Sequence, residues 1–130
     1  MYAERLGLPR ALSLNPFAAM AASGIVLALG SDSPVTPLDP WGSVRAAVHH
    51  RTPGSGLDAG AAFEAHTRGG WHAAGRDADG VLAAGAPATF AVWESAELEP
   101  ATGLPPLGPE DDLPRCLRTV VRGRTVHLAG

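Results

Sequence analysis

Residues 25–40 read IVLALGSDSPVTPLDP, and this stretch decides the predicted fold. Its first five residues are apolar without alternation, which predicts a strand over 25–29 that is buried on both faces. Gly30 ends the strand, and Asp32 follows just beyond its carboxyl end, where ligands bind in parallel α/β folds. Because an acid beside a buried sheet needs a hydrogen bond, an ion pair or a cation, Asp32 is the first candidate functional residue.

Two helices are expected, one before this strand and one after it. Asn15 precedes a proline and is expected to cap the first helix, which Gly24 ends in the left-handed conformation. Asp39 also precedes a proline and is expected to cap a second helix that ends near Arg51. Trp41 and the valines that follow it at helical spacing form the inner face of that second helix.

A third helix is predicted from Asp58 as its cap to about residue 74, with Ala62, Phe63 and His66 on one side. Gly69 is followed by a second glycine, and each is unfavourable in a helix by about 1 kcal/mol relative to alanine. The end of this helix is therefore expected to be broken or tightly packed.

The remainder of the chain has the pattern of a β structure. A strand is expected over 89–93, followed by a long exposed loop over 94–114 that is acidic and rich in proline and glycine. Residues 117–121 and 124–128 are expected to pair as a hairpin around Arg122 and Gly123. The chain is thus predicted to divide into an α/β portion, 1–76, and a small β-rich portion, 77–130.

Composition excludes several classes of protein. The 130 residues carry a formal net charge of −3 with acids and bases interspersed, so no nucleic-acid partner is expected. No apolar run approaches the roughly 20 residues of a membrane span, and no signal peptide is apparent, so a cytoplasmic location is expected. The single cysteine, Cys116, allows no internal disulfide, and an inert thiol is expected there.

Five segments together resemble the C-terminal part of an amidohydrolase-superfamily enzyme, and the branch they resemble most is that of the N-substituted formamide deformylases. The segments are NPFAAMAASGIVLALGSDSPV (15–35), TPLDPWGSVRAAV (36–48), AAFEAHTRGGWHAAG (61–75), GVLAAGAPATFAVWE (80–94) and LRTVVRGRTVHLAG (117–130). The resemblance implies an α/β fold that is the C-terminal part of a (β/α)8 (TIM-like) barrel, followed by part of a small β-sandwich. Thr89 stands where the family's closing strand has an acid.

The resemblance also implies a chemistry. Enzymes of this kind use zinc or another divalent metal to activate a water that attacks an amide-type carbon–nitrogen bond of a small molecule. Asp32 matches the aspartate that moves the proton and often touches the metal, so it is assigned as both catalytic residue and metal ligand. The family's metal-binding histidines and its bridging lysine or glutamate have no counterpart before residue 25, so this chain alone is expected to bind no metal. The alternative for Asp32 is an ordinary turn or helix-cap acid.

The histidines and the C-terminal arginines are expected to have structural rather than catalytic roles. His49 and His50 are adjacent at a helix end, where one of them is expected to interact with the helix dipole. His66 is expected to be a satisfied core histidine, and His72 and His127 are expected at the surface or in the sheet. Arg115, Arg118, Arg122 and Arg124 are expected to be solvated or to pair with the acids at 110–112.

Three functional hypotheses follow. The chain is a C-terminal piece of a hydrolase, with Met1 an internal methionine; or a non-catalytic subunit; or one half of a split enzyme. A buried strand without neighbours would expose unpaired backbone and an apolar face. The isolated chain is therefore expected to be a homo-oligomer, to lack an N-terminal portion, or to require a partner, and to show no turnover alone.

Overall fold

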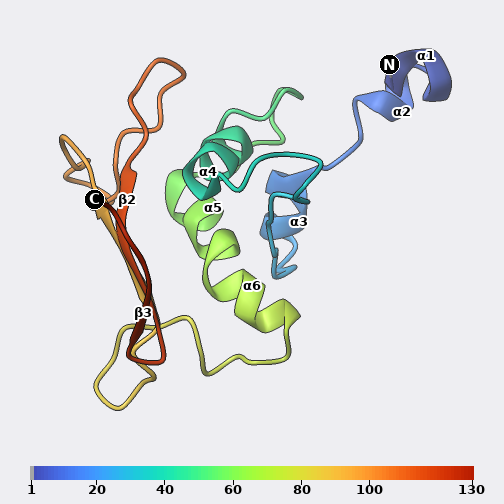
Figure 1. Cartoon of the computed structure of the whole chain (residues 1–130). Coiled ribbons are helices and arrows are strands. Elements are labelled where there is room, and N and C mark those ends of the chain that lie inside the picture. Colours follow the sequence, from blue (N-terminus) through green and yellow to red (C-terminus); the bar gives the residue numbers. More distant parts are fainter. Residues whose placement is uncertain (1) are drawn as a thin grey trace.

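The structure is a computed structural model that describes residues 2–130, so Met1 lies outside it. It is a mixed α/β structure (Figure 1). The helices are α1 (Tyr2–Leu6), α2 (Leu8–Ala11), α3 (Phe17–Ala22), α4 (Pro40–Val48), α5 (Ala59–His66) and α6 (Arg68–Ala73), and the strands are β1 (Phe90–Glu94), β2 (Arg115–Val121) and β3 (Arg124–Leu128).

The predicted strand over residues 25–29 does not form. The segment runs without secondary structure, and its backbone amides bond at its two ends, from Ile25 to the Met20 carbonyl at 3.1 Å and from Leu29 to the Ala65 carbonyl at 3.0 Å. A strand exists only where a neighbouring strand completes its ladder, and no strand of residues 2–130 lies beside this segment. The expected burial is also wrong, because Ile25 is 50% exposed and Val26 is 60% exposed.

The helix signals were largely correct. The Asp39 carboxylate accepts a hydrogen bond from the Gly42 amide at 2.9 Å, and this contact begins α4 as predicted. Asp58 does the same for α5, accepting from the Ala61 amide at 2.8 Å. Such side-chain caps satisfy amides that the first helical turn leaves unpaired, which is why these two positions could be read from the sequence.

The ends of α3 follow the sequence prediction at one terminus only. Asn15 has a φ of 53° and makes no capping bond, and Pro16 occupies the N-cap position instead. Gly24 has the expected left-handed conformation with a φ of 76°. Its amide bonds to the Ala21 carbonyl at 2.9 Å, while the next amide reaches back to Met20, and this is the Schellman arrangement that ends a helix.

The third predicted helix is broken, and its glycine pair is tightly packed at one position. The break lies at Thr67, which separates α5 from α6 with a φ of −112° and a ψ of −87°. Gly69 in α6 lies against the 25–29 segment, because a Cβ built there would be 2.0 Å from the Leu27 carbonyl oxygen. At Gly70 the same Cβ would meet nothing within 4 Å.

The β-rich region forms one antiparallel sheet with strand order β1-β2-β3. In the register, Phe90 lies opposite Val120 and Glu94 opposite Arg115. The hairpin between β2 and β3 turns at Arg122 and Gly123, with φ angles of 49° and 80°, as the Arg-Gly pair predicts. Positive φ at both central positions is typical of the turns that match the twist of paired strands.

A small core joins the helices to the sheet side of the molecule. Trp41 on α4 is 7% exposed, stacks on Phe63 at 5.6 Å and meets Trp93 of β1 edge-on at 6.1 Å. The loop over 94–114, expected to be exposed throughout, contributes Leu107 to this core at 7% exposure, with Leu104 packed against it. Apolar leucines between the prolines explain the difference, because they cover the face of the helices.

The elements are arranged with the helices α3 to α6 on one side and the sheet on the other, while α1 and α2 stand apart at the end of a connecting segment (Figure 1). No helix within residues 2–130 is long and apolar enough to cross a membrane.

The helices and the three-stranded sheet confirm the α/β character of the chain. Its placement in a (β/α)8 barrel and the division near residue 76 stay predictions.

Candidate functional site

Asp32 lies on an exposed turn that follows the 25–29 segment. Its φ of 56° is left-handed, a conformation that aspartate and asparagine tolerate better than most residues. Its carbonyl accepts the Val35 amide at 2.9 Å, and its carboxylate makes no hydrogen bond or ion pair to any residue in 2–130. Within residues 2–130 the Asp32 carboxylate is exposed to solvent and has neither the hydrogen bond nor the ion pair that was expected, and its pairing with a cation stays a prediction.

The serines beside Asp32 shape this turn. The Ser31 hydroxyl accepts the Ser33 amide at 3.3 Å, and the Thr36 hydroxyl donates to the Ser31 carbonyl. Both contacts fix the backbone on either side of Asp32 rather than its carboxylate. The turn therefore presents a free, solvated carboxylate on a constrained backbone, which suits a group that accepts a proton or a cation.

The residues present do not fit a metal centre. No group of three or more histidine, cysteine, aspartate or glutamate side chains within 2–130 is placed to hold a metal ion. Zinc needs at least three protein ligands together, and Asp32 stands without a second donor from this chain. We therefore derive no metal-dependent step from these residues alone.

Three histidines line a cavity whose wall includes Gly30 and Ser31, the two residues before Asp32. The cavity has a volume of about 550 Å³. His49 and His50 enter it from the end of α4, and His66 enters it from the end of α5. The structure thus brings His66 into one cavity with His49 and His50, although not at metal-ligand spacing.

His49 and His50 are held by backbone groups. The Nε2 of His49 donates to the Leu107 carbonyl at 2.8 Å, which ties the 94–114 loop to α4. The Nδ1 of His50 lies 3.0 Å from the Thr52 amide nitrogen and 3.4 Å from the Thr52 carbonyl oxygen. The shorter contact favours Nδ1 as the acceptor, and in a neutral ring this places the hydrogen on Nε2. His49 occupies the C-cap position of α4, where the predicted interaction with the helix carboxyl end is expected.

His66 differs from the prediction of a satisfied core histidine. It is half-buried, and its Nε2 is a buried atom without a hydrogen-bond partner in the described part of the chain. Burial lowers the pKa of the His66 imidazole below its usual value near 6.5, because the charged form is poorly solvated there. The spacing of apolar residues in α5 predicted that His66 lies on the inner face of the helix. It could not predict that the buried Nε2 has no hydrogen-bond partner among the described residues.

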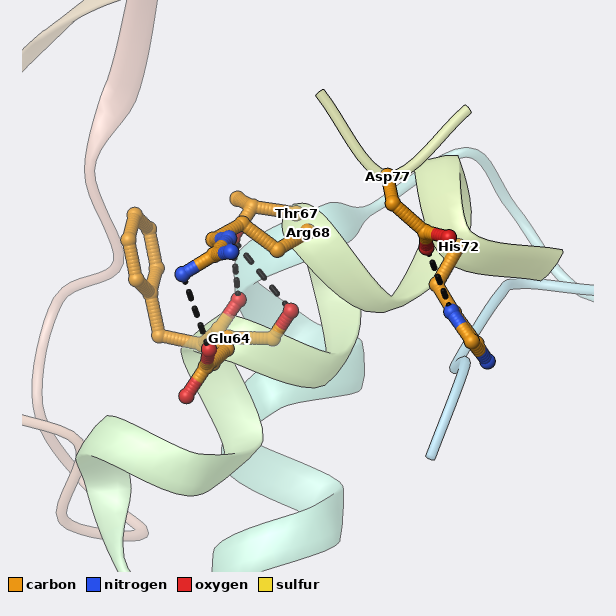
Figure 2. Close-up of polar contacts among 6 residues, drawn as sticks. Glu64, Thr67, Arg68, His72 and Asp77 are labelled. Atoms are coloured by element: carbon orange, nitrogen blue, oxygen red, sulfur yellow. Dashed lines mark hydrogen bonds and ion pairs between the residues drawn. The ribbon is translucent and has the colours of Figure 1, made fainter. Parts of the chain in front are cut away.

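Polar contacts connect residues of α5, α6 and the segment that follows α6 (Figure 2). Arg68 pairs with Glu64 at 3.7 Å, and the Thr67 hydroxyl donates to the Phe63 carbonyl at 2.9 Å where the helix breaks. The Nδ1 of His72 lies 2.6 Å from the Asp77 carboxylate (Figure 2). His72 is exposed, as predicted, and so is His127 on β3, but the Asp77 partner was not foreseen.

The remaining candidates have structural roles. Cys116 is half-buried in β2, with its Sγ 3.5 Å from the Thr119 hydroxyl. Arg115 pairs with Glu94 across β1 and β2 at 3.1 Å, and Arg118 donates to the Thr125 hydroxyl, so neither pairs with the acids at 110–112. The predicted solvated hairpin is confirmed.

A family model described as the amidohydrolase family matches residues 1–127, so the chain belongs to the amidohydrolase family. No curated protein and no solved structure matches the chain. The family resemblance predicted from the sequence is confirmed at this level, whereas no particular branch is supported.

Proposed function

We propose that this chain takes part in the hydrolysis of an amide-type carbon–nitrogen bond in a small molecule, with Asp32 as the residue that transfers the proton. The observation that carries the proposal is the family match over residues 1–127 together with the free carboxylate of Asp32. A solvated carboxylate without a competing partner is available both to a proton and to a cation. The proposal keeps the N-substituted formamide deformylase-like branch as the reference for substrate type.

The proposal includes groups beyond this chain's own. Family members typically use a metal, zinc being the one expected here, and residues 2–130 hold no group of three or more ligating side chains that could bind it. We therefore propose that the other ligands come from residues outside these 130, in the same polypeptide or in a partner chain. Such residues would also cover the exposed backbone and the apolar side chains of the 25–29 segment.

A second candidate function is that of a non-catalytic subunit that oligomerises. The observation that favours it is the exposure of Ile25 and Val26, at 50% and 60%, next to Val35 and Leu38, at 77% and 81%. Apolar side chains this exposed along one stretch of chain are typical of an interface. The two candidates differ in whether Asp32 matters.

The test is to isolate the native protein from its source cells with an antibody against the β2–β3 hairpin. Its mass, its zinc content and its hydrolysis of N-acyl amides are then compared with those of the 130-residue chain alone. We expect turnover and zinc in the native protein, accompanied by a larger mass or a second chain. A homogeneous 13.3 kDa protein with stoichiometric zinc and turnover would contradict our placement of the ligands. The same mass without turnover would favour the non-catalytic subunit.

A further inference from the structure

His49, His50 and His66 line a cavity that, among the described residues, contains basic side chains and no acidic ones. The proposed hydrolysis assigns no role to these basic groups. Arg51 also lines the cavity, and no aspartate or glutamate of the described residues does. Arg51 makes no ion pair with any residue in 2–130. The cavity therefore has positive or neutral nitrogen donors and no fixed negative charge in its wall, in a chain whose formal net charge is −3.

One donor in this cavity has its orientation fixed. The His50 ring meets Phe17 edge-on at 5.3 Å, and its Nδ1 is occupied by the Thr52 amide. The Nε2–H of His50 is consequently left as a donor that no residue of the described chain uses. Arg51 also lines this cavity, and a guanidinium is a charge-assisted donor suited to a planar anion.

The rest of the wall mixes apolar and polar residues. Leu14, Phe17 and Leu29 supply apolar surface, which an ion with only polar atoms would leave unused. The polar members are Asn15, Ser31, Thr36, Ser43 and Thr52. A volume of about 550 Å³ lies within the range of roughly 300–1,000 Å³ that small-molecule sites occupy. The lining therefore fits a small carboxylate with an apolar body better than it fits an inorganic anion.

From this geometry we infer that the cavity binds a small aromatic or aliphatic monocarboxylate, held by Arg51 and the His50 Nε2–H. The inference rests in part on the proposed function, because Ser31 of the cavity wall adjoins Asp32, the residue proposed to transfer the proton. The site is thus assigned to a carboxylate carried by the amide substrate, since the acyl product of a formamide is formate, which has no apolar body. No reaction step is needed for binding.

Benzoate is the probe, and the test is titration calorimetry or chemical-shift titration on the full chain. We expect saturable benzoate binding, at least tenfold weaker binding of benzamide and benzylamine, and a loss of fivefold or more in Arg51→Gln. Arg124→Gln, which removes the same charge from the exposed hairpin strand β3, is the matched control and should bind benzoate like the wild type. His50→Ala provides a second variant and should also weaken binding.

Several results would overturn the inference. They are equal binding of benzoate and benzamide, unchanged binding in Arg51→Gln and His50→Ala, equal loss in Arg124→Gln, or phosphate binding as tight as that of benzoate. Because the titration requires no turnover, it is independent of the test of function. Hydrolysis by the native protein without benzoate binding would contradict only this inference. Benzoate binding without hydrolysis would contradict only the proposed function.

Discussion

At the scale of single residues, Asp32 and His66 show what a sequence pattern can and cannot locate. Asp32 follows the apolar run 25–29, but its carboxylate is exposed and has no partner within residues 2–130, rather than lying beside a buried strand. His66 was placed on the correct helical face, yet its Nε2 has no partner in residues 2–130. Position along the chain follows from local pattern, whereas the partners of a side chain depend on which distant residues the fold brings near.

His66 makes the stability of the chain depend on pH. The folded state holds its pKa below the unfolded value near 6.5, so the unfolded state binds more protons as the pH falls. The contribution of neutral His66 is therefore present above pH 6.5 and is lost as the pH falls from 6.5 through the folded pKa. We expect wild-type protein to lose more stability than His66→Phe between pH 7.5 and 5.5.

Urea unfolding at the two pH values measures this difference. His127→Phe is the matched control, since His127 is an exposed histidine on β3, and it should follow the wild type. Equal losses in wild type and His66→Phe would show that the burial of His66 does not control its protonation.

At the scale of elements, local signals predicted helix starts and the hairpin but not the strand. Asp39 and Asp58 cap their helices as expected, and the turn at Arg122 and Gly123 forms where the dipeptide predicts it. These features depend on contacts within a few residues. The strand over 25–29 depends on neighbouring strands, and residues 2–130 place none beside it, so an apolar run alone could not decide its state.

The two glycines of α6 offer a test of how tightly this element packs on the 25–29 segment. Gly69→Ala would place its Cβ 2.0 Å from the Leu27 carbonyl oxygen, so that segment or α6 must move. We expect a loss of about 1–3 kcal/mol, the usual cost of overpacking. Gly70→Ala meets open space and should gain roughly 0.5–1 kcal/mol from helix propensity.

Thermal or urea unfolding of both variants gives the comparison. Because the two positions share one helix and one residue type, their difference isolates the contact with Leu27. Similar stability changes in both variants would mean that α6 does not pack on the segment as described.

At the scale of the whole molecule, the described residues leave several large apolar side chains exposed. Ile25 and Val26 are exposed on a segment whose backbone amides have few partners, and several large apolar side chains elsewhere are exposed as well. Burial of apolar area is worth about 25 cal/mol per Å², so this surface favours association. The histidine-lined cavity and the core around Trp41 are formed within the chain itself.

We expect the isolated chain to have a mass above 13.3 kDa in light scattering coupled to size-exclusion chromatography. The double variant Ile25→Lys, Val26→Lys should shift it toward the monomer, because two charges would be buried at the interface. Leu8→Lys, at an exposed apolar position on α2, is the control and should leave the mass unchanged. A monomeric wild-type chain would contradict the expectation.

The central claim, that this amidohydrolase-family chain supplies the proton-transferring carboxylate, is tested most directly by amide hydrolysis of the native protein carrying Asp32→Asn. Asparagine keeps the left-handed backbone at φ 56° and removes only the ionisable group. The account predicts a fall in kcat of about 10²–10⁴-fold, the usual contribution of a positioned acid or base. Asp112→Asn, at an exposed acid away from the turn, should keep full activity. Undiminished kcat in Asp32→Asn, or an equal fall in both variants, would contradict the claim.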